Sequence, residues 1–137
     1  MKYLVSLALL VALVCCGGAP AKAPSPSIAR EEARNATLVL SEAWKLGADA
    51  CIDLSVAGKV QLKACEDVFM PARAVILSAA DLVDSWDAAA ANKFPCIVKA
   101  AAAGLRQGLL LAQLKGTENK VIDTALAMAD TYGRGCQ

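Results

Sequence analysis

The residues of this chain best suited to chemistry are its six cysteines. Two of them are adjacent, at positions 15 and 16, and the other four are spread over the rest of the chain: Cys51, Cys65, Cys96 and Cys136. Four thiolates can bind zinc, but such sites usually contain a Cys-x-x-Cys pair, which this sequence lacks. An even number of cysteines in an exported chain favours disulfide bonds instead, and no metal site is expected.

The spacing of these four cysteines predicts how they pair. Cys51 and Cys65 each lie seven residues from Gly58, and the last two cysteines each lie twenty residues from Gly116. Glycine ends helices readily, and positions equidistant from the turn of an antiparallel helix hairpin lie opposite each other. The predicted disulfides are Cys51–Cys65 and Cys96–Cys136.

Three carboxylates recur at every third position: Asp81, Asp84 and Asp87. Carboxylates one helical turn apart can bind calcium or contact a basic partner. Side chains at this spacing drift around the helix axis, so few of their oxygens converge, and a solvated helix face is the favoured interpretation. Because acidic groups near a helix C-terminus oppose its dipole, basic groups are expected nearby. The candidates are Arg73, Lys93 and Lys99.

No catalytic residue and no cofactor are expected. The sequence has no histidine, which removes the commonest general base and the commonest zinc ligand. The serines of the domain lack a histidine partner and a Gly-x-Ser-x-Gly setting: Ser41, Ser55, Ser78 and Ser85. No glycine-rich loop of the phosphate-binding type occurs. These absences predict that the protein is not an enzyme.

The charge balance argues against a nucleic-acid partner. The chain has 14 basic and 13 acidic residues, and loss of Lys2 with an export signal would leave equal numbers of the two. A nucleic-acid-binding domain usually carries a basic excess, so no nucleic acid is expected.

Abundant alanine, few aromatic residues and the absence of β-branched runs predict an all-α fold over residues 27–137. The expected helices run from Ser27 to Gly58, from about Lys59 to about Ala91, from Cys96 to Lys115 and from Glu118 to Tyr132, with a turn at Asn92–Pro95. These helices are expected to form a four-helix domain of two antiparallel hairpins, each clasped by one of the disulfides.

Apolar and small residues recur at steps of three and four, which is typical of helices with one buried face. In the first helix the stripe is Ala33, Ala36, Leu40, Ala43, Gly47, Ala50 and Leu54. In the second it is Leu62, Cys65, Phe69, Ala72, Ile76, Ala79, Val83 and Trp86. The second stripe does not slip at Pro71, which predicts a continuous helix there. Gly104 and Gly108 predict close packing against a neighbouring helix rather than a membrane dimer, because Lys99 and Arg106 interrupt the apolar run.

The segment before this domain has the pattern of an export signal. Lys2 precedes an apolar core from Tyr3 to Val14, which is broken only by Ser6. A helix that spans a bilayer needs roughly 20 apolar residues, and this core is shorter. It matches the apolar region of a secretory signal, which is removed from the mature protein.

The end of this core, Leu13-Val14-Cys15-Cys16, resembles the lipidation box of bacterial lipoproteins. In that family a leucine and two small residues precede the cysteine that receives the lipid. The resemblance implies a signal peptide over residues 1–15 and lipidation of Cys16. Because the family usually has Gly, Ala or Ser where this chain has Cys15, that cysteine is an alternative acceptor. Cleavage at Ala19-Pro20-Ala21, which would release a soluble secreted protein, is a further alternative.

Residues 16–26 are rich in proline and alanine, which predicts a flexible tether between the lipid and the domain. In this family an aspartate after the lipidated cysteine retains the protein in the inner membrane. Gly17 occupies that position, so the resemblance implies the outer membrane when the host has one.

These observations predict a non-enzymatic cell-envelope lipoprotein that acts as a structural or interaction module. Its expected partners are the membrane, through the N-terminal lipid anchor, and a protein of the envelope. The alternative is a carrier of a small apolar ligand, with a cavity beside Trp44 and Trp86. Core packing is the favoured interpretation of both tryptophans and of Phe69, because each falls on or beside an apolar stripe. A large apolar cavity would favour the carrier, and a solid core with an exposed apolar patch would favour interaction.

Overall fold

The computed structural model describes residues 28–114 and 119–137 of the chain. Four helices make up most of this part: α2 (Arg30–Val56), α3 (Leu62–Asp84), α4 (Ala88–Leu111) and α5 (Lys120–Gly133). No strand occurs in either described range. The all-α fold class predicted from the sequence is therefore confirmed.

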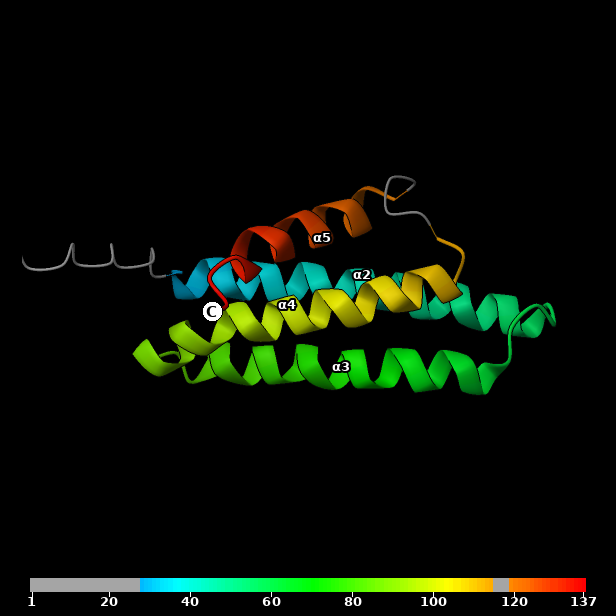
Figure 1. The fold of residues 1–137 in the computed structure, drawn as a ribbon, viewed down its shortest axis with the longest axis horizontal. Helices are drawn as coiled ribbons and strands as arrows, with labels where there is room; N and C mark the ends of the chain where they lie inside the picture. Colours follow the sequence, from blue (N-terminus) through cyan, green and yellow to red (C-terminus); the bar gives the residue numbers. More distant parts are fainter. Residues whose placement is uncertain (1–27, 115–118) are drawn as a thin grey trace, which may run out of the picture.

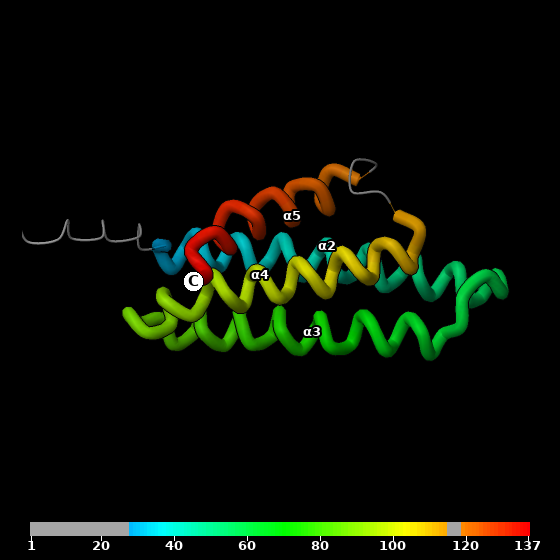
Figure 2. Tube along the Cα trace, viewed as in Figure 1, coloured from blue at the N-terminus to red at the C-terminus, as the bar shows by residue number. Residues whose placement is uncertain are grey.

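The helices run up, down, up and down along a common direction (Figures 1 and 2). The three long helices lie side by side, and α3 and α4 make the most extensive contact. The shorter α5 lies across α2 and α4, on the side away from α3 (Figure 1). Because α2 has 27 residues and α5 has 14, α5 covers only the end of the bundle near the start of α2.

The core consists mainly of the stripes predicted from periodicity. In α3 the six buried residues all belong to the predicted stripe: Cys65, Phe69, Ala72, Ile76, Ala79 and Val83. In α2 the predicted stripe is buried as far as Gly47, after which Cys51 is buried rather than Ala50. Leu62 was expected to be buried but is exposed, because it is the first residue of α3.

Phe69 fills a slot formed by glycines of two other helices. A Cβ atom built on Gly108 of α4 would lie 2.6 Å from Cζ of Phe69, and one built on Gly47 of α2 would lie 2.9 Å from its Cε1. One turn earlier in α4, a Cβ atom on Gly104 would lie 3.1 Å from Cβ of Ala72. The close packing predicted from the four-residue glycine spacing is confirmed, and it lets α2, α3 and α4 approach around one aromatic ring.

The predicted boundary between the second and third helices is wrong. The turn lies at residues 85–87 rather than at Asn92–Pro95, and α4 begins at Ala88. The carboxylate Oδ1 of Asp87 accepts a hydrogen bond from the main-chain N–H of Ala90 at 2.7 Å, so Asp87 caps the new helix. Pro95 lies inside α4, where a proline removes one main-chain hydrogen bond without ending this helix.

The other helix ends agree more closely with the sequence. Gly58 has φ = +71°, a backbone conformation that glycine adopts readily, and it follows the end of α2 as predicted. Helix α3 continues through Pro71, also as predicted. Helix α5 begins after Asn119, whose side chain accepts a hydrogen bond from the N–H of Val121 at 2.9 Å.

Several predictions concern positions outside the described residues. They are the signal peptide over residues 1–15, the lipidation of Cys16, the tether over residues 16–26, the start of the first helix at Ser27, and the turn at Gly116.

Within the described ranges, α4 is the one helix long and apolar enough to cross a membrane by length and composition. Such a test is also passed by the core helix of a soluble protein. Nine residues of α4 are buried in the bundle, including Phe94, Val98 and Leu105. The burial of these side chains agrees with a core helix.

Candidate functional site

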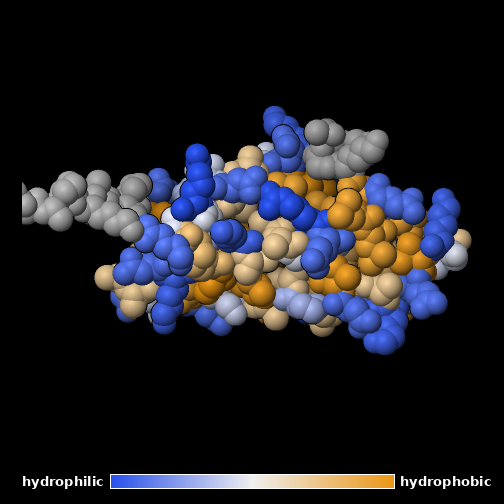
Figure 3. Space-filling model, viewed as in Figure 1, coloured by the Kyte–Doolittle hydropathy of each residue, from blue (hydrophilic) through white to orange (hydrophobic). Residues whose placement is uncertain are grey.

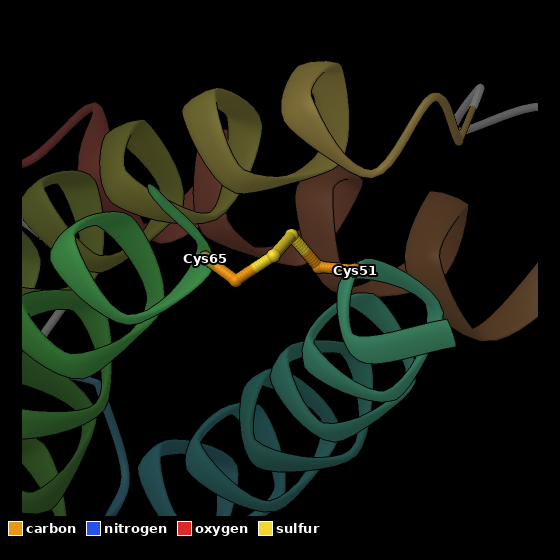
Figure 4. The surroundings of a disulfide bond; sticks show 2 residues. All are labelled: Cys51 and Cys65. Carbon is orange, nitrogen blue, oxygen red and sulfur yellow. A yellow bond between two sulfur atoms is a disulfide. The ribbon is translucent and has the colours of Figure 1, made fainter. Parts of the chain in front are cut away.

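The first predicted disulfide is present and joins the last turns of α2 to the first turn of α3. Figure 4 shows Cys51 and Cys65 facing each other across this hairpin, with a Cα–Cα distance of 5.9 Å. Both cysteines are buried, with exposed fractions of 0% and 4%. The disulfide therefore closes the bundle from inside its core.

The second predicted disulfide joins Cys96 of α4 to Cys136, with a Cα–Cα distance of 4.6 Å. Cys136 belongs to the C-terminal tail, residues 134–137, which follows α5. Both cysteines are only half-buried. This disulfide holds the tail near the start of α4, at the end of the bundle opposite the α2–α3 loop (Figure 1).

The tail packs closely on α4. A Cβ atom built on Gly135 would lie 3.3 Å from Cγ of Pro95, and one built on Gly133 would lie 3.2 Å from Cβ of Lys99. The N–H of Cys136 donates a hydrogen bond to the carbonyl of Gly133 at 3.0 Å. Small residues in and before the tail thus allow the backbone to reach the surface of α4.

The acidic series does not form one helix face. Asp81 and Asp84 belong to the last turn of α3, whereas Asp87 caps α4 after the turn. The carboxylate of Asp87 is engaged by the N–H of Ala90 and is not available as part of a regular row. Within residues 28–114 and 119–137, no group of three or more acidic or cysteine side chains is placed to hold a metal ion.

The C-terminus of α3 is neutralised by Arg30, a residue that the sequence did not single out. Nε of Arg30 donates a hydrogen bond to the carbonyl of Val83 at 2.8 Å, and its NH2 group donates to the carbonyl of Asp84 at 3.3 Å. These contacts supply the positive charge that the end of a helix favours. They join residues more than fifty positions apart, so no local sequence pattern indicates them.

The three expected sources of this compensation do not form the contact. Arg73 lies over the ring of Trp44, with its Cζ 5.6 Å from the ring centroid. Lys99 lies beside Gly133, and Lys93 is exposed on α4. Arg30, and not one of these three side chains, therefore supplies the positive charge at the end of α3.

Both tryptophans pack at the edge of the core, as favoured from the sequence. The indole Nε1–H of Trp44 donates a hydrogen bond to the carbonyl of Phe69 at 2.7 Å. Trp86 contacts the buried ring of Phe94 edge-on, with the centroids 5.6 Å apart. Aromatic pairs prefer this geometry, and a half-buried indole needs a partner for its N–H. The two rings thus pack as part of the core.

Two surface clefts flank α5. The first, of about 550 Å³, lies between α4 and α5 and is lined by Lys99, Arg106, Asp130 and Arg134, among others. Arg106 and Asp130 form an exposed ion pair at 2.6 Å. The second, called the tail cleft below, has a volume of about 760 Å³ and lies between the start of α2, the first turns of α4 and the tail.

The pKa of one residue in the tail cleft, Tyr132, is shifted. Burial, with a smaller effect from the negative charge of Glu32, raises the pKa of Tyr132 above its ordinary value. Cys96 lines the same cleft.

No protein-family model, curated protein or solved structure matches this chain.

Proposed function

We propose that this protein is a non-enzymatic lipoprotein of the bacterial cell envelope that acts as a structural or interaction module. A lipid on Cys16 would hold it at the outer membrane, and residues 16–26 would form the tether to the helical domain. The proposed partners are the membrane and a protein of the envelope.

The observation that carries the proposal is the pairing of all four cysteines of the domain. Disulfides persist in oxidising compartments and are rare in the reducing cytosol. Cys51–Cys65 and Cys96–Cys136 therefore agree with an exported protein. The apolar core that ends at Leu13-Val14-Cys15-Cys16 supplies both the export signal and the resemblance to a lipidation box.

The packing of the bundle favours interaction over transport of a ligand. Phe69 occupies the space between Gly47 and Gly108, and both tryptophans are engaged in packing contacts. Apolar side chains are instead exposed at the end of the bundle where α2 and α3 are joined. Val56 is 85% exposed and Leu110 is 79% exposed. Figure 3 shows apolar residues gathered on this half of the visible face.

The lipid anchor is tested by intact mass spectrometry of the protein from the membrane fraction. We expect a mature chain that starts at Cys16 and carries a diacylglyceryl group. The variant Cys16→Ala should lose the lipid and leave the membrane fraction, whereas the matched variant Cys15→Ala should keep both. A mature chain that starts at Cys15 and carries the lipid there would move the acceptor by one residue. A soluble product that starts at Lys22 would refute the anchor and favour a secreted protein.

The interaction role is tested by site-specific photocrosslinking in native membranes. A photoreactive residue at position 110 should give a discrete crosslinked species, and the same residue at Asp81, on the exposed side of α3, should not. If neither position gives a discrete product, the proposed role of the exposed apolar end is wrong.

A further inference from the structure

The two disulfides differ sharply in their access to solvent. Cys51 and Cys65 are 0% and 4% exposed and lie between α2 and α3 (Figure 4). Cys96 and Cys136 are half-buried, and Cys96 lines the tail cleft, whose volume of about 760 Å³ admits a small thiol. A thiolate must reach a disulfide sulfur to react with it, so access limits the reaction rate. Of the two disulfides, the second is the one whose cysteines are partly exposed in the folded protein.

The tail and α5 are linked to α4 by the second disulfide, by the exposed ion pair between Arg106 and Asp130, and by packing. The hydrogen bonds from the N–H groups of Gly135 and Cys136 go to carbonyls of residues 132 and 133, within the same turn of chain. The contacts of Gly133 and Gly135 with α4 are packing contacts. Helix α5 is the shortest of the four, and its buried residues are mainly small: Ile122, Ala125, Ala129 and Gly133. Between the side chains of the tail and those of α4, the Cys96–Cys136 disulfide is the only covalent bond.

We propose that Cys96–Cys136 is a thiol-exchange site, whose substrate is a dithiol reductant that enters through the tail cleft. The thiolate of the reductant attacks Sγ of Cys96 and forms a mixed disulfide, while the Cys96–Cys136 bond breaks. The electron pair of that bond leaves with Sγ of Cys136, which takes a proton from water. The second thiol of the reductant then attacks the mixed disulfide. This step releases the oxidised reductant and the free thiol of Cys96, so two electrons pass to the protein.

Exchange at this site also changes the cleft. Tyr132 of α5 and Arg134 and Gly135 of the tail line the tail cleft together with Ala91 and Pro95 of α4. Once the disulfide is open, no covalent bond between side chains holds the tail to α4. Reduction therefore opens the cleft and loosens α5, whereas the buried disulfide keeps α2 and α3 joined. This inference does not depend on the lipid anchor.

The test uses the folded mature protein with both disulfides formed. It is treated with dithiothreitol, quenched at intervals with N-ethylmaleimide and analysed by peptide mass mapping. We expect Cys96 and Cys136 to be labelled at least about tenfold faster than Cys51 and Cys65, since the buried pair reacts only after local or global opening. Equal rates for the two disulfides, or the reverse order, would overturn the proposal.

The attacked sulfur is identified with glutathione, a monothiol that leaves its adduct on the protein. We expect glutathione on Cys96 and a free thiol on Cys136 in acid-quenched samples. An adduct mainly on Cys136 would show that the attack does not come from the tail cleft. In the matched variant Cys51→Ala/Cys65→Ala, the labelling rate of Cys96 should stay within about twofold of the wild-type rate. A rise of about tenfold or more would mean that opening of the bundle, and not access through the cleft, limits the reaction.

The conformational consequence is measured by hydrogen exchange of the selectively reduced protein. Amides of residues 121–132 should exchange faster than in the oxidised protein, while those of α2 and α3 should stay protected. If α5 keeps its protection after reduction, the disulfide does not control the cleft.

Discussion

At the scale of single residues, one aromatic side chain decides how closely three helices approach. The ring of Phe69 packs against two glycines, Gly47 of α2 and Gly108 of α4. Glycine inside a helix costs about 1 kcal/mol relative to alanine, so its presence at both positions needs a reason. The reason is steric, because a methyl group at either position would overlap the ring.

Gly108→Ala is expected to destabilise the protein even though alanine favours helix formation. The new Cβ atom would lie 2.6 Å from Phe69, and overpacking of a core costs about 1–3 kcal/mol. Urea unfolding measures the change. Adding Phe69→Leu should recover part of the loss, since the smaller side chain relieves the overlap. A stabilising effect of Gly108→Ala alone would contradict the observed packing.

Tyr132 is expected to make stability depend on pH in the alkaline range. Burial, and to a smaller extent Glu32, raise the pKa of its phenol in the folded state. The folded protein therefore holds this proton more tightly than the unfolded chain does. The stabilisation is fully present below the ordinary pKa of about 10 and is lost as pH rises through the higher folded pKa. Urea midpoints of wild type and Tyr132→Phe should diverge above about pH 10, and parallel curves would contradict this.

At the scale of elements, the boundary between α3 and α4 is set by contacts at both helix ends. Arg30 donates hydrogen bonds to the last carbonyls of α3, and Asp87 accepts one from the first turn of α4. Proline is favoured at the first position of a helix, which favours a start of the third helix close to Pro95. Four alanines after a capping aspartate favour an earlier start. The proline is tolerated inside α4, where its ring packs against Gly135.

Asp87→Ala is expected to reduce the free energy of unfolding by about 1 kcal/mol, because the cap of α4 is lost. The matched variant Asp84→Ala removes a carboxylate from the end of α3, where it caps nothing, and should be neutral or slightly stabilising. Thermal unfolding of the two variants gives the comparison. Equal losses would indicate that the capping bond of Asp87 is not the source of the effect.

At the scale of the whole molecule, each end of the bundle is closed by one disulfide. Cys51–Cys65 lies next to the α2–α3 loop, and Cys96–Cys136 lies at the end where α2 begins (Figure 1). Alanine supplies much of the core, and each alanine buries little apolar area. A covalent link is therefore an effective source of stability for this domain.

Removal of the disulfides should have unequal and separable effects. In the chain-entropy model, the link across 14 residues contributes about 3 kcal/mol and the link across 40 residues about 4 kcal/mol. We expect Cys51→Ala/Cys65→Ala to weaken α2 and α3, and Cys96→Ala/Cys136→Ala to increase exchange mainly in α5. Denaturant unfolding and hydrogen exchange measure the two effects. Uniform exchange throughout the bundle in both variants would show that the links do not act locally.

The sequence by itself determined what depends on periodicity and spacing along the chain. Steps of three and four predict the buried faces of α2 and α3, because a helix returns to the same face at these intervals. Cysteines placed symmetrically about Gly58 and Gly116 predict both disulfides, because a hairpin brings equidistant positions together. Local patterns in the N-terminal segment likewise underlie the prediction of an export signal and of a lipid anchor at Cys16.

Only the tertiary structure decided what depends on partners far apart in the chain. Arg30 reaches the end of α3 across more than fifty residues, and its effect on that helix has no local signal. The boundary at Asp87 results from competition between two plausible helix starts, which contacts at both ends resolve. The unequal exposure of the two disulfides follows from how α5 and the tail pack on α4. Spacing predicts which cysteines meet, whereas three-dimensional packing decides how deeply each disulfide is buried.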